Sequence, residues 1–173
     1  MTIALRRAIG VCAITLAAPF AASAQESTNR VNSMTDWNVF VDANPKECWG
    51  VSKPIESINT KDGAPVSVRR GDILLFVTYR PGAAPQVSFT GGYPFASGST
   101  VSVAVGGTTF ELFSDVEWAW SGSAEDDAAL IRALRGGADA VISARSGRGT
   151  QTSDKFSLRG FSAAMDDAAA RCK

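Results

Sequence analysis

Apolar residues recur at every second position along most of this chain, which is the pattern of half-buried β-strands. In the run DWNVFV, the side chains of Trp37, Val39 and Val41 share one face. Residues 47–51 give a second short strand with the same period. The alternation predicts a mostly β fold.

The clearest local pattern is a β-hairpin over residues 100–113. Valines alternate over residues 101–105, and residues 108–113 return with the same period. Gly106 and Gly107 lie between the two runs and tolerate the positive φ that a two-residue turn requires.

Further strands are expected at residues 73–79, 86–90, 117–120, 138–144 and 156–158. The first of these, ILLFVTY, is too continuous for a half-exposed strand and predicts a central one. The basic, glycine-broken stretch between the last two predicts a solvated hairpin tip, with an anion site as the alternative.

Two helices interrupt the strand pattern. Ser123 has the position of an N-cap, and the glycine pair at 136–137 ends the first helix. Gly160 marks a bend, after which Ser162 is the expected cap of a closing helix that extends to Arg171.

Nine or ten short strands with two short helices predict a single-domain β-sandwich or a partly closed barrel. The second helix lies at the C-terminus. We expect residues 34–173 to form this domain and residues 25–33 to be a flexible N-terminus, because their composition is polar.

Residues 1–24 have the composition of a signal peptide. Arg6 and Arg7 form the basic start, residues 8–20 are apolar, and a small-residue cleavage site ends at Ala24. The apolar run is shorter than the roughly 20 residues that span a bilayer. We expect a cleaved leader and an exported protein without a transmembrane segment; a retained amphipathic anchor is the alternative.

Charge and cysteine content limit the mature chain further. Loss of Arg6 and Arg7 from 17 basic residues leaves fifteen against 17 acidic ones, so no nucleic-acid partner is expected. Cys12 leaves with the leader, and Cys48 and Cys172 remain. In an oxidising compartment this pair predicts one disulfide, with two separate thiols as the alternative.

The chain has no histidine, which excludes Ser-His-Asp and Cys-His catalysis and histidine metal ligands. Two cysteines in a bridge cannot supply a structural zinc site. We therefore expect no enzyme of these classes and no metal site. Glu111, Asp115 and Glu117 could serve a carboxylate-based hydrolase, but alternation along a strand explains them more simply.

Aromatic residues are the candidate binding residues: Tyr93 and Phe95 in the GGYPF segment, and Trp118 and Trp120 in the short strand EWAW. The expected ligand of these side chains is a partner protein. Packing in the core is the alternative for these side chains, and a periplasmic glycan or small-molecule module is the alternative function.

Several stretches resemble the invasion-associated locus B family. The tail SLRGFSAAMDDAAARC, residues 157–172, is similar to the closing strand, bend and helix of that family. The runs DWNVFV, ECWGVSKP and RRGDILLFVTYRPG with VSFTGGYPF are similar too, and they occur in the same order.

This resemblance implies an exported protein of the bacterial envelope, periplasmic or associated with the outer membrane. Named members are linked to host-cell invasion, so the expected partner is an envelope or host protein. The resemblance implies no enzyme, no catalytic residues and no cofactor. Family members often carry another cysteine near the first tryptophan strand, where this chain has Val41. The disulfide pattern of other members therefore does not transfer, which indicates a divergent member.

Overall fold

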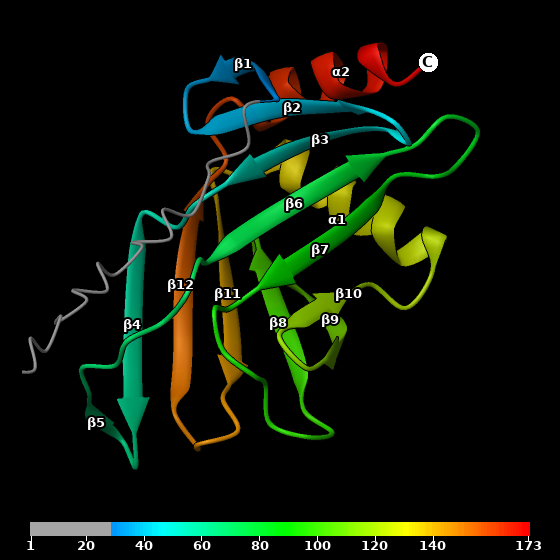
Figure 1. Ribbon diagram of the computed structural model, residues 1–173. Helices are drawn as coiled ribbons and strands as arrows, with labels where there is room; N and C mark the ends of the chain where they lie inside the picture. Colours follow the sequence, from blue (N-terminus) through cyan, green and yellow to red (C-terminus); the bar gives the residue numbers. More distant parts are fainter. Residues whose placement is uncertain (1–28) are drawn as a thin grey trace, which may run out of the picture.

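The computed structural model describes residues 29–173 and contains twelve strands and two helices in that range (Figure 1). The expected signal peptide and its cleavage site lie outside the described residues. The strands in chain order are β1 (Arg30–Met34), β2 (Trp37–Ala43), β3 (Lys46–Ser52), β4 (Glu56–Lys61), β5 (Ala64–Pro65), β6 (Leu74–Tyr79), β7 (Gln86–Thr90), β8 (Thr100–Val105), β9 (Thr108–Asp115), β10 (Trp118–Trp120), β11 (Asp139–Arg145) and β12 (Gln151–Ser157). The helices are α1 (Ala124–Gly136) and α2 (Phe161–Arg171).

All twelve strands belong to one antiparallel sheet in the order β1-β2-β3-β6-β7-β10-β9-β8-β11-β12-β4-β5. The sheet curls until its two halves meet: the ring of Phe89 in β7 lies 6.2 Å from that of Phe156 in β12. The Trp37 indole nitrogen donates to the Ser157 carbonyl oxygen at 3.0 Å. The prediction of a mostly β fold is confirmed. The strands form one sheet that does not close, and not the two sheets of a sandwich.

Both helices lie on the inner face of the sheet. In Figure 1, α1 runs behind β6 and β7, and α2 lies against β2 and β3. The apolar stripe of α1, which comprises Leu130, Ile131 and Leu134, is buried as its spacing predicts. Across the inner face, these side chains and the inward-facing residues of the strands form one core.

The ends of α1 follow the prediction, and the start of α2 does not. Ser123 Oγ accepts a hydrogen bond from the Asp126 backbone nitrogen at 3.1 Å, and Gly137 is the C-cap. The N-cap of α2 is Gly160 and not Ser162. The helix begins earlier than expected because Phe161 is buried edge-on against the Trp37 ring, 4.9 Å away.

Three strands differ clearly from the sequence prediction. Strand β12 starts at Gln151 instead of residue 156, because Thr152 and Asp154 point into the interior and break the expected apolar pattern. Strand β4, ESINTK, has no buried residue and gives no alternation to detect. Strand β1 takes in residues 30–33 of the segment expected to be flexible, since its backbone pairs with β2.

The hairpin prediction is confirmed in β8 and β9, with Gly106 at φ 55° and Gly107 at φ 85° in the turn. Strand β6 is central, as predicted, because it pairs with both β3 and β7. The expectation that β6 is buried on both faces is wrong: its outward side chains, Phe76 and Thr78, are only half-buried.

The predicted disulfide between Cys48 and Cys172 is confirmed. It joins β3 to the residue after α2. The two Cα atoms are 5.6 Å apart, and the two cysteines are 124 positions apart in the sequence. Both cysteines are buried. Because α2 contacts β1, β2, β3 and β6, the bridge holds this helix against the first half of the sheet.

Candidate functional site

Strands β2, β3, β6, β7, β10 and β9 are neighbours, and their outer face carries a row of aromatic side chains. Paired residues on adjacent antiparallel strands lie on the same face, and Phe40 pairs with Trp49 while Phe113 pairs with Trp120. We call this surface the outer aromatic face; it comprises Phe40, Trp49, Phe76, Phe113, Trp118 and Trp120.

The six rings form two contiguous groups. Phe40 and Trp49 stack in parallel with ring centroids 5.6 Å apart. In the second group, the ring centroids of Phe76 and Trp118 are 5.7 Å apart, and those of Trp118 and Trp120 are 6.5 Å apart. Phe113 completes this group at 5.6 Å from Trp120. These separations are those of favourable aromatic pairs, so the face is preformed.

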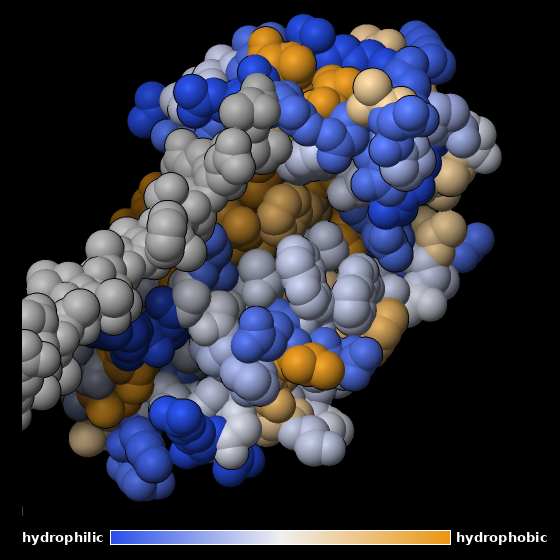
Figure 2. Space-filling model, viewed as in Figure 1, coloured by the Kyte–Doolittle hydropathy of each residue, from blue (hydrophilic) through white to orange (hydrophobic). Residues whose placement is uncertain are grey.

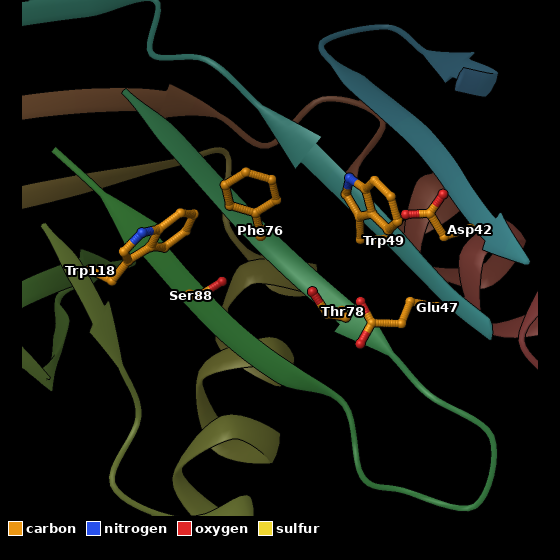
Figure 3. Close-up of a pocket in the computed structure, with 7 residues that line it drawn as sticks. All are labelled: Asp42, Glu47, Trp49, Phe76, Thr78, Ser88 and Trp118. Carbon is orange, nitrogen blue, oxygen red and sulfur yellow. The ribbon is translucent and has the colours of Figure 1, made fainter. Parts of the chain in front are cut away.

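A shallow groove of about 240 Å³ separates the two groups (Figure 3). Trp49 stands on one side, and Phe76 and Trp118 stand on the other. The hydroxyl-bearing side chain of Thr78 lies next to Trp49, and that of Ser88 lies between Phe76 and Trp118. Figure 2 shows the same side of the molecule hollowed near its middle, with apolar residues in the hollow and hydrophilic residues beside it.

Two carboxylates line the end of the groove next to Trp49. Asp42 and Glu47 face each other across β2 and β3. Glu47 accepts a hydrogen bond from Arg80 Nε at 2.5 Å, and Asp42 accepts one from the Asn29 side chain. The groove therefore combines aromatic walls, hydroxyl groups and negative charge, which suits a ligand with apolar or cationic groups.

The four candidate binding residues are found in two different environments. Trp118, with 39% of its surface exposed, and Trp120 lie on the outer aromatic face. Phe95 is only 7% exposed and packs in the core against Phe89, with centroids 6.2 Å apart. Tyr93 is half-buried beside it, at 5.3 Å. The GGYPF segment thus contributes packing side chains and not an aromatic surface.

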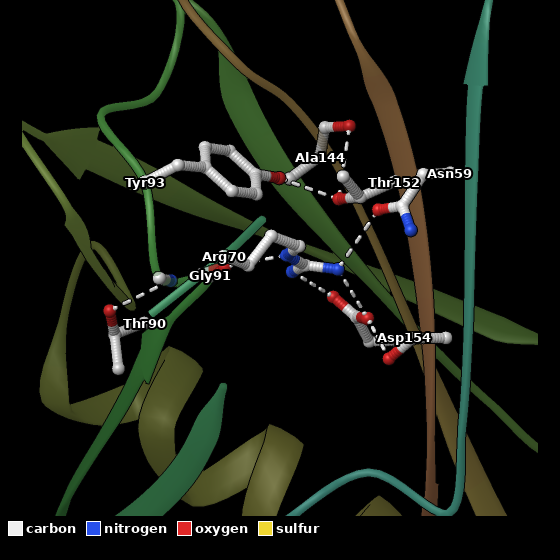
Figure 4. Close-up of polar contacts among 10 residues, drawn as sticks. Asn59, Arg70, Thr90, Gly91, Tyr93, Ala144, Thr152 and Asp154 are labelled. Carbon is white, nitrogen blue, oxygen red and sulfur yellow. Dashed lines mark hydrogen bonds and ion pairs between the residues drawn. The ribbon is translucent and has the colours of Figure 1, made fainter. Parts of the chain in front are cut away.

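Tyr93 belongs to a buried polar network on the inner side of the sheet (Figure 4). Arg70 forms two parallel bonds with Asp154, at 2.8 and 2.7 Å, and their side chains are 6% and 0% exposed. Arg70 Nε also donates to the Gly91 carbonyl oxygen at 2.9 Å, and Ser57 Oγ donates to Asp154 at 2.7 Å. The buried charges are therefore paired and hydrogen-bonded, as burial requires.

The ring of Tyr93 lies under this ion pair. The Arg70 guanidinium carbon is 4.9 Å from the Tyr93 ring centroid, and the Tyr93 and Thr152 hydroxyls are hydrogen-bonded at 2.5 Å. Burial raises the pKa of Tyr93, against the opposing effects of the Thr152 hydrogen bond and the Arg70 charge. Because Arg70 bonds both to the Gly91 carbonyl oxygen and to Asp154, the network joins the loops at residues 70 and 91 to β12.

The carboxylates considered for hydrolysis do not form a site. Glu111, Asp115 and Glu117 are exposed and do not line the groove. Within residues 29–173, no group of three or more cysteine or carboxylate side chains is arranged to hold a metal ion. No helix in the same range has the length and hydropathy needed to cross a membrane.

Sequence reasoning found Trp118 and Trp120 and missed the other four residues of the outer aromatic face, Phe113 among them. Phe40, Trp49 and Phe76 each alternate with inward-facing residues of their strands. A usable signal is present in DWNVFV, where Phe40 is at an even position and so faces away from Trp37 and Val39. The same parity argument finds Trp49 opposite Cys48, but the continuous apolar run around Phe76 hides it.

Comparisons with known proteins agree with this architecture. The family model of Invasion associated locus B (IalB) protein matches residues 37–169. The crystal structure of invasion associated protein b from Bartonella henselae is similar in fold, with a TM-score of 0.56 and 16% sequence identity. The match covers 80% of this chain and 95% of that chain. No curated protein matches the sequence.

The family model spans most of the chain, from the first residue of β2 to the last turn of α2, and so includes nearly all of the segments on which the resemblance rested. The chain belongs to the invasion associated locus B family.

Proposed function

We propose that this is an exported, non-enzymatic protein of the bacterial envelope that acts by binding another protein through the outer aromatic face. The single observation that carries the proposal is the exposure of aromatic side chains on an ordered sheet. Phe113 is 52% exposed and Trp118 is 39% exposed, and both are in contact with Trp120. Clustered aromatic side chains of this kind are enriched where proteins bind one another.

Two further features support a binding role in the envelope. The leader-like composition of residues 1–24 favours export, and the disulfide of Cys48 and Cys172 suits an oxidising compartment. The absence of histidine removes the commonest acid–base catalyst, and the exposure of Glu111, Asp115 and Glu117 favours a non-enzymatic role. A role in host-cell invasion is part of this proposal because the name of the family refers to it.

The test is crosslinking in intact cells that produce the wild-type protein or the double variant Phe113→Ser/Trp118→Ser. We expect a crosslinked partner protein with the wild type and its loss with the double variant. Ile58→Ser is the matched control, because Ile58 on β4 is 51% exposed but lies away from the aromatic face. A partner that is captured equally by all three proteins would refute the proposed face.

A glycan-binding module is a second candidate, favoured by one observation. The groove places the hydroxyls of Thr78 and Ser88 beside aromatic rings, since Thr78 pairs with Trp49 and Ser88 pairs with Phe76. Sugars bind proteins through such combinations of aromatic surface and hydroxyl groups. Titration with envelope oligosaccharides would then change the tryptophan fluorescence, and Trp49→Phe would remove most of that change. A flat titration across a broad panel of sugars would exclude this candidate.

A further inference from the structure

Most of the charged residues on the outer aromatic face are carboxylates; the basic exceptions are Arg30, which pairs with Phe40 on the adjoining strand β1, and Arg80, which forms an ion pair with Glu47. On its six strands, the charged side chains that share the outward parity of the rings are four carboxylates: Asp42, Glu47, Glu111 and Asp115. Lys46, the one basic residue in these strands, has the opposite parity and donates to the Lys173 carbonyl oxygen beyond α2. Arg80, just after β6, neutralises Glu47.

The carboxylates accompany the rings along the whole row. Asp42 and Glu47 adjoin the groove next to Trp49, and Asp115 pairs with Trp118 at the other side. Glu111 lies two positions before Phe113 on β9, so it shares that outward face. An aromatic ring attracts a cation through its negative face, and a neighbouring carboxylate adds to that attraction. The two features therefore favour the same ligand charge.

The length of the row favours a polymer over a small cation. Six neighbouring strands span about 24 Å at the usual spacing of about 4.8 Å. An extended polypeptide covers that distance with about seven residues, at about 3.3 Å for each residue. A single quaternary amine would fill only the groove between Trp49 and Phe76 and would leave Phe113 and Trp120 unused.

We infer that the outer aromatic face binds an extended basic segment of a partner polypeptide, whose Lys or Arg side chains lie over the rings and pair with Asp42, Asp115 and Glu111. This inference rests on the proposed function and specifies the chemistry of the partner. The groove takes one long basic side chain between Trp49 and Phe76, with its charged group directed to Asp42.

The test uses the exported protein and two fluorescein-labelled decapeptides, one alternating Arg with Thr and the other alternating Glu with Thr. Fluorescence anisotropy measures their binding at low and high ionic strength. We expect the basic peptide to bind and the acidic one not to bind. Asp42→Asn/Asp115→Asn should weaken binding of the basic peptide about tenfold, since two exposed ion pairs contribute up to about 1 kcal/mol each.

Two further variants separate the face from general charge attraction. Trp118→Ser should also weaken binding of the basic peptide, with its far-UV circular dichroism unchanged. The control variant Glu56→Gln/Asp139→Asn also removes two negative charges, but from β4 and β11 on the other half of the sheet. It should bind the basic peptide like the wild type. Equal losses in the two charge variants, or equal binding of both peptides, would overturn the inference.

Competition identifies other occupants. If phosphocholine or an envelope oligosaccharide binds at Trp118 while the basic peptide does not, the basic-segment inference is wrong. Failure of this inference differs from failure of the proposed function. A crosslinked partner that is lost in Phe113→Ser/Trp118→Ser but retained in Asp42→Asn/Asp115→Asn keeps the face and excludes the basic segment. Retention in both variants excludes the face itself.

Discussion

Asp154 is an acidic residue inside the sheet, and its environment determines what a substitution there will cost. Its carboxylate is fully buried and receives both Arg70 nitrogens and the Ser57 hydroxyl. Removal of one partner from a buried ion pair leaves the other charge without compensation in a medium of low polarity. The network is therefore sensitive to the loss of one charge, even though an apolar replacement of the whole pair could be tolerated.

We predict that Asp154→Asn lowers the free energy of unfolding by about 3–5 kcal/mol, because it leaves the Arg70 guanidinium buried beside a neutral amide. Urea denaturation at neutral pH measures the change. Asp166→Asn is the control: it breaks the exposed pair with Arg135 and should cost less than about 1 kcal/mol. Equal costs for the two variants would show that the Arg70 pair contributes no more than a surface pair.

At the scale of single residues, the sequence predicts some positions of the site and conceals others. Trp118 and Trp120 are recognisable because two tryptophans alternate within a short strand. Asp154 instead reads as part of a solvated hairpin, because its neighbours are polar and its partner Arg70 is 84 positions away in the sequence. A buried charge can be inferred only when both partners are seen together, and no local pattern does this.

Helices and strands are predictable from the sequence where one segment contains both a regular apolar spacing and the residues that begin or end the element. The β8–β9 hairpin and helix α1 satisfy this condition through their glycine turn and their Ser123 cap. Strand β4 escapes prediction because it owes its existence to pairing with β12, and its exposed side chains show no alternation. The predicted start of α2 is misplaced because Gly160, and not a polar cap, fits the space beside β1.

Gly160 provides the second prediction, at the junction of β12 and α2. Its φ is +88°, and a Cβ there would lie 1.8 Å from the Met34 carbonyl oxygen in β1. Gly107 has a nearly equal φ of +85°, and a Cβ there would meet no atom within 4 Å. Alanine is strained at both positions, but only at Gly160 must it also displace backbone.

Gly160→Ala should therefore reduce stability by about 2 kcal/mol more than Gly107→Ala, since overpacking of this kind costs about 1–3 kcal/mol. Thermal and urea unfolding of the two variants measure the difference. Near-equal losses would mean that β1 moves away from Gly160 at little cost. Such a result would also indicate that the Met34 end of β1 is weakly held.

At the scale of the whole molecule, the disulfide joins strand β3 of the open sheet to the residue that follows α2. The bridge between Cys48 and Cys172 closes a loop of 124 positions. In the chain-entropy model, a loop of this length restricts the unfolded chain by roughly 4–5 kcal/mol. Few other single interactions can contribute as much to the stability of a domain of this size.

We predict that Cys48→Ala/Cys172→Ala unfolds at lower urea concentration, with a loss of about 2–5 kcal/mol relative to the oxidised wild type. Addition of dithiothreitol should destabilise the wild type by a similar amount and leave the double variant unchanged. If the reductant changes neither protein while mass analysis shows that the bridge has been reduced, the bridge contributes no stability.

The position of Cys172 beyond the last helix has a consequence for biogenesis. Cys172, the partner of Cys48, is synthesised after all twelve strands and both helices of the described chain. A nascent polypeptide stopped anywhere between them would carry a lone reactive thiol on β3. Formation of the bond between Cys48 and Cys172 by an oxidant of the compartment therefore requires that α2 has already been synthesised, and shorter products would be open to mixed disulfides.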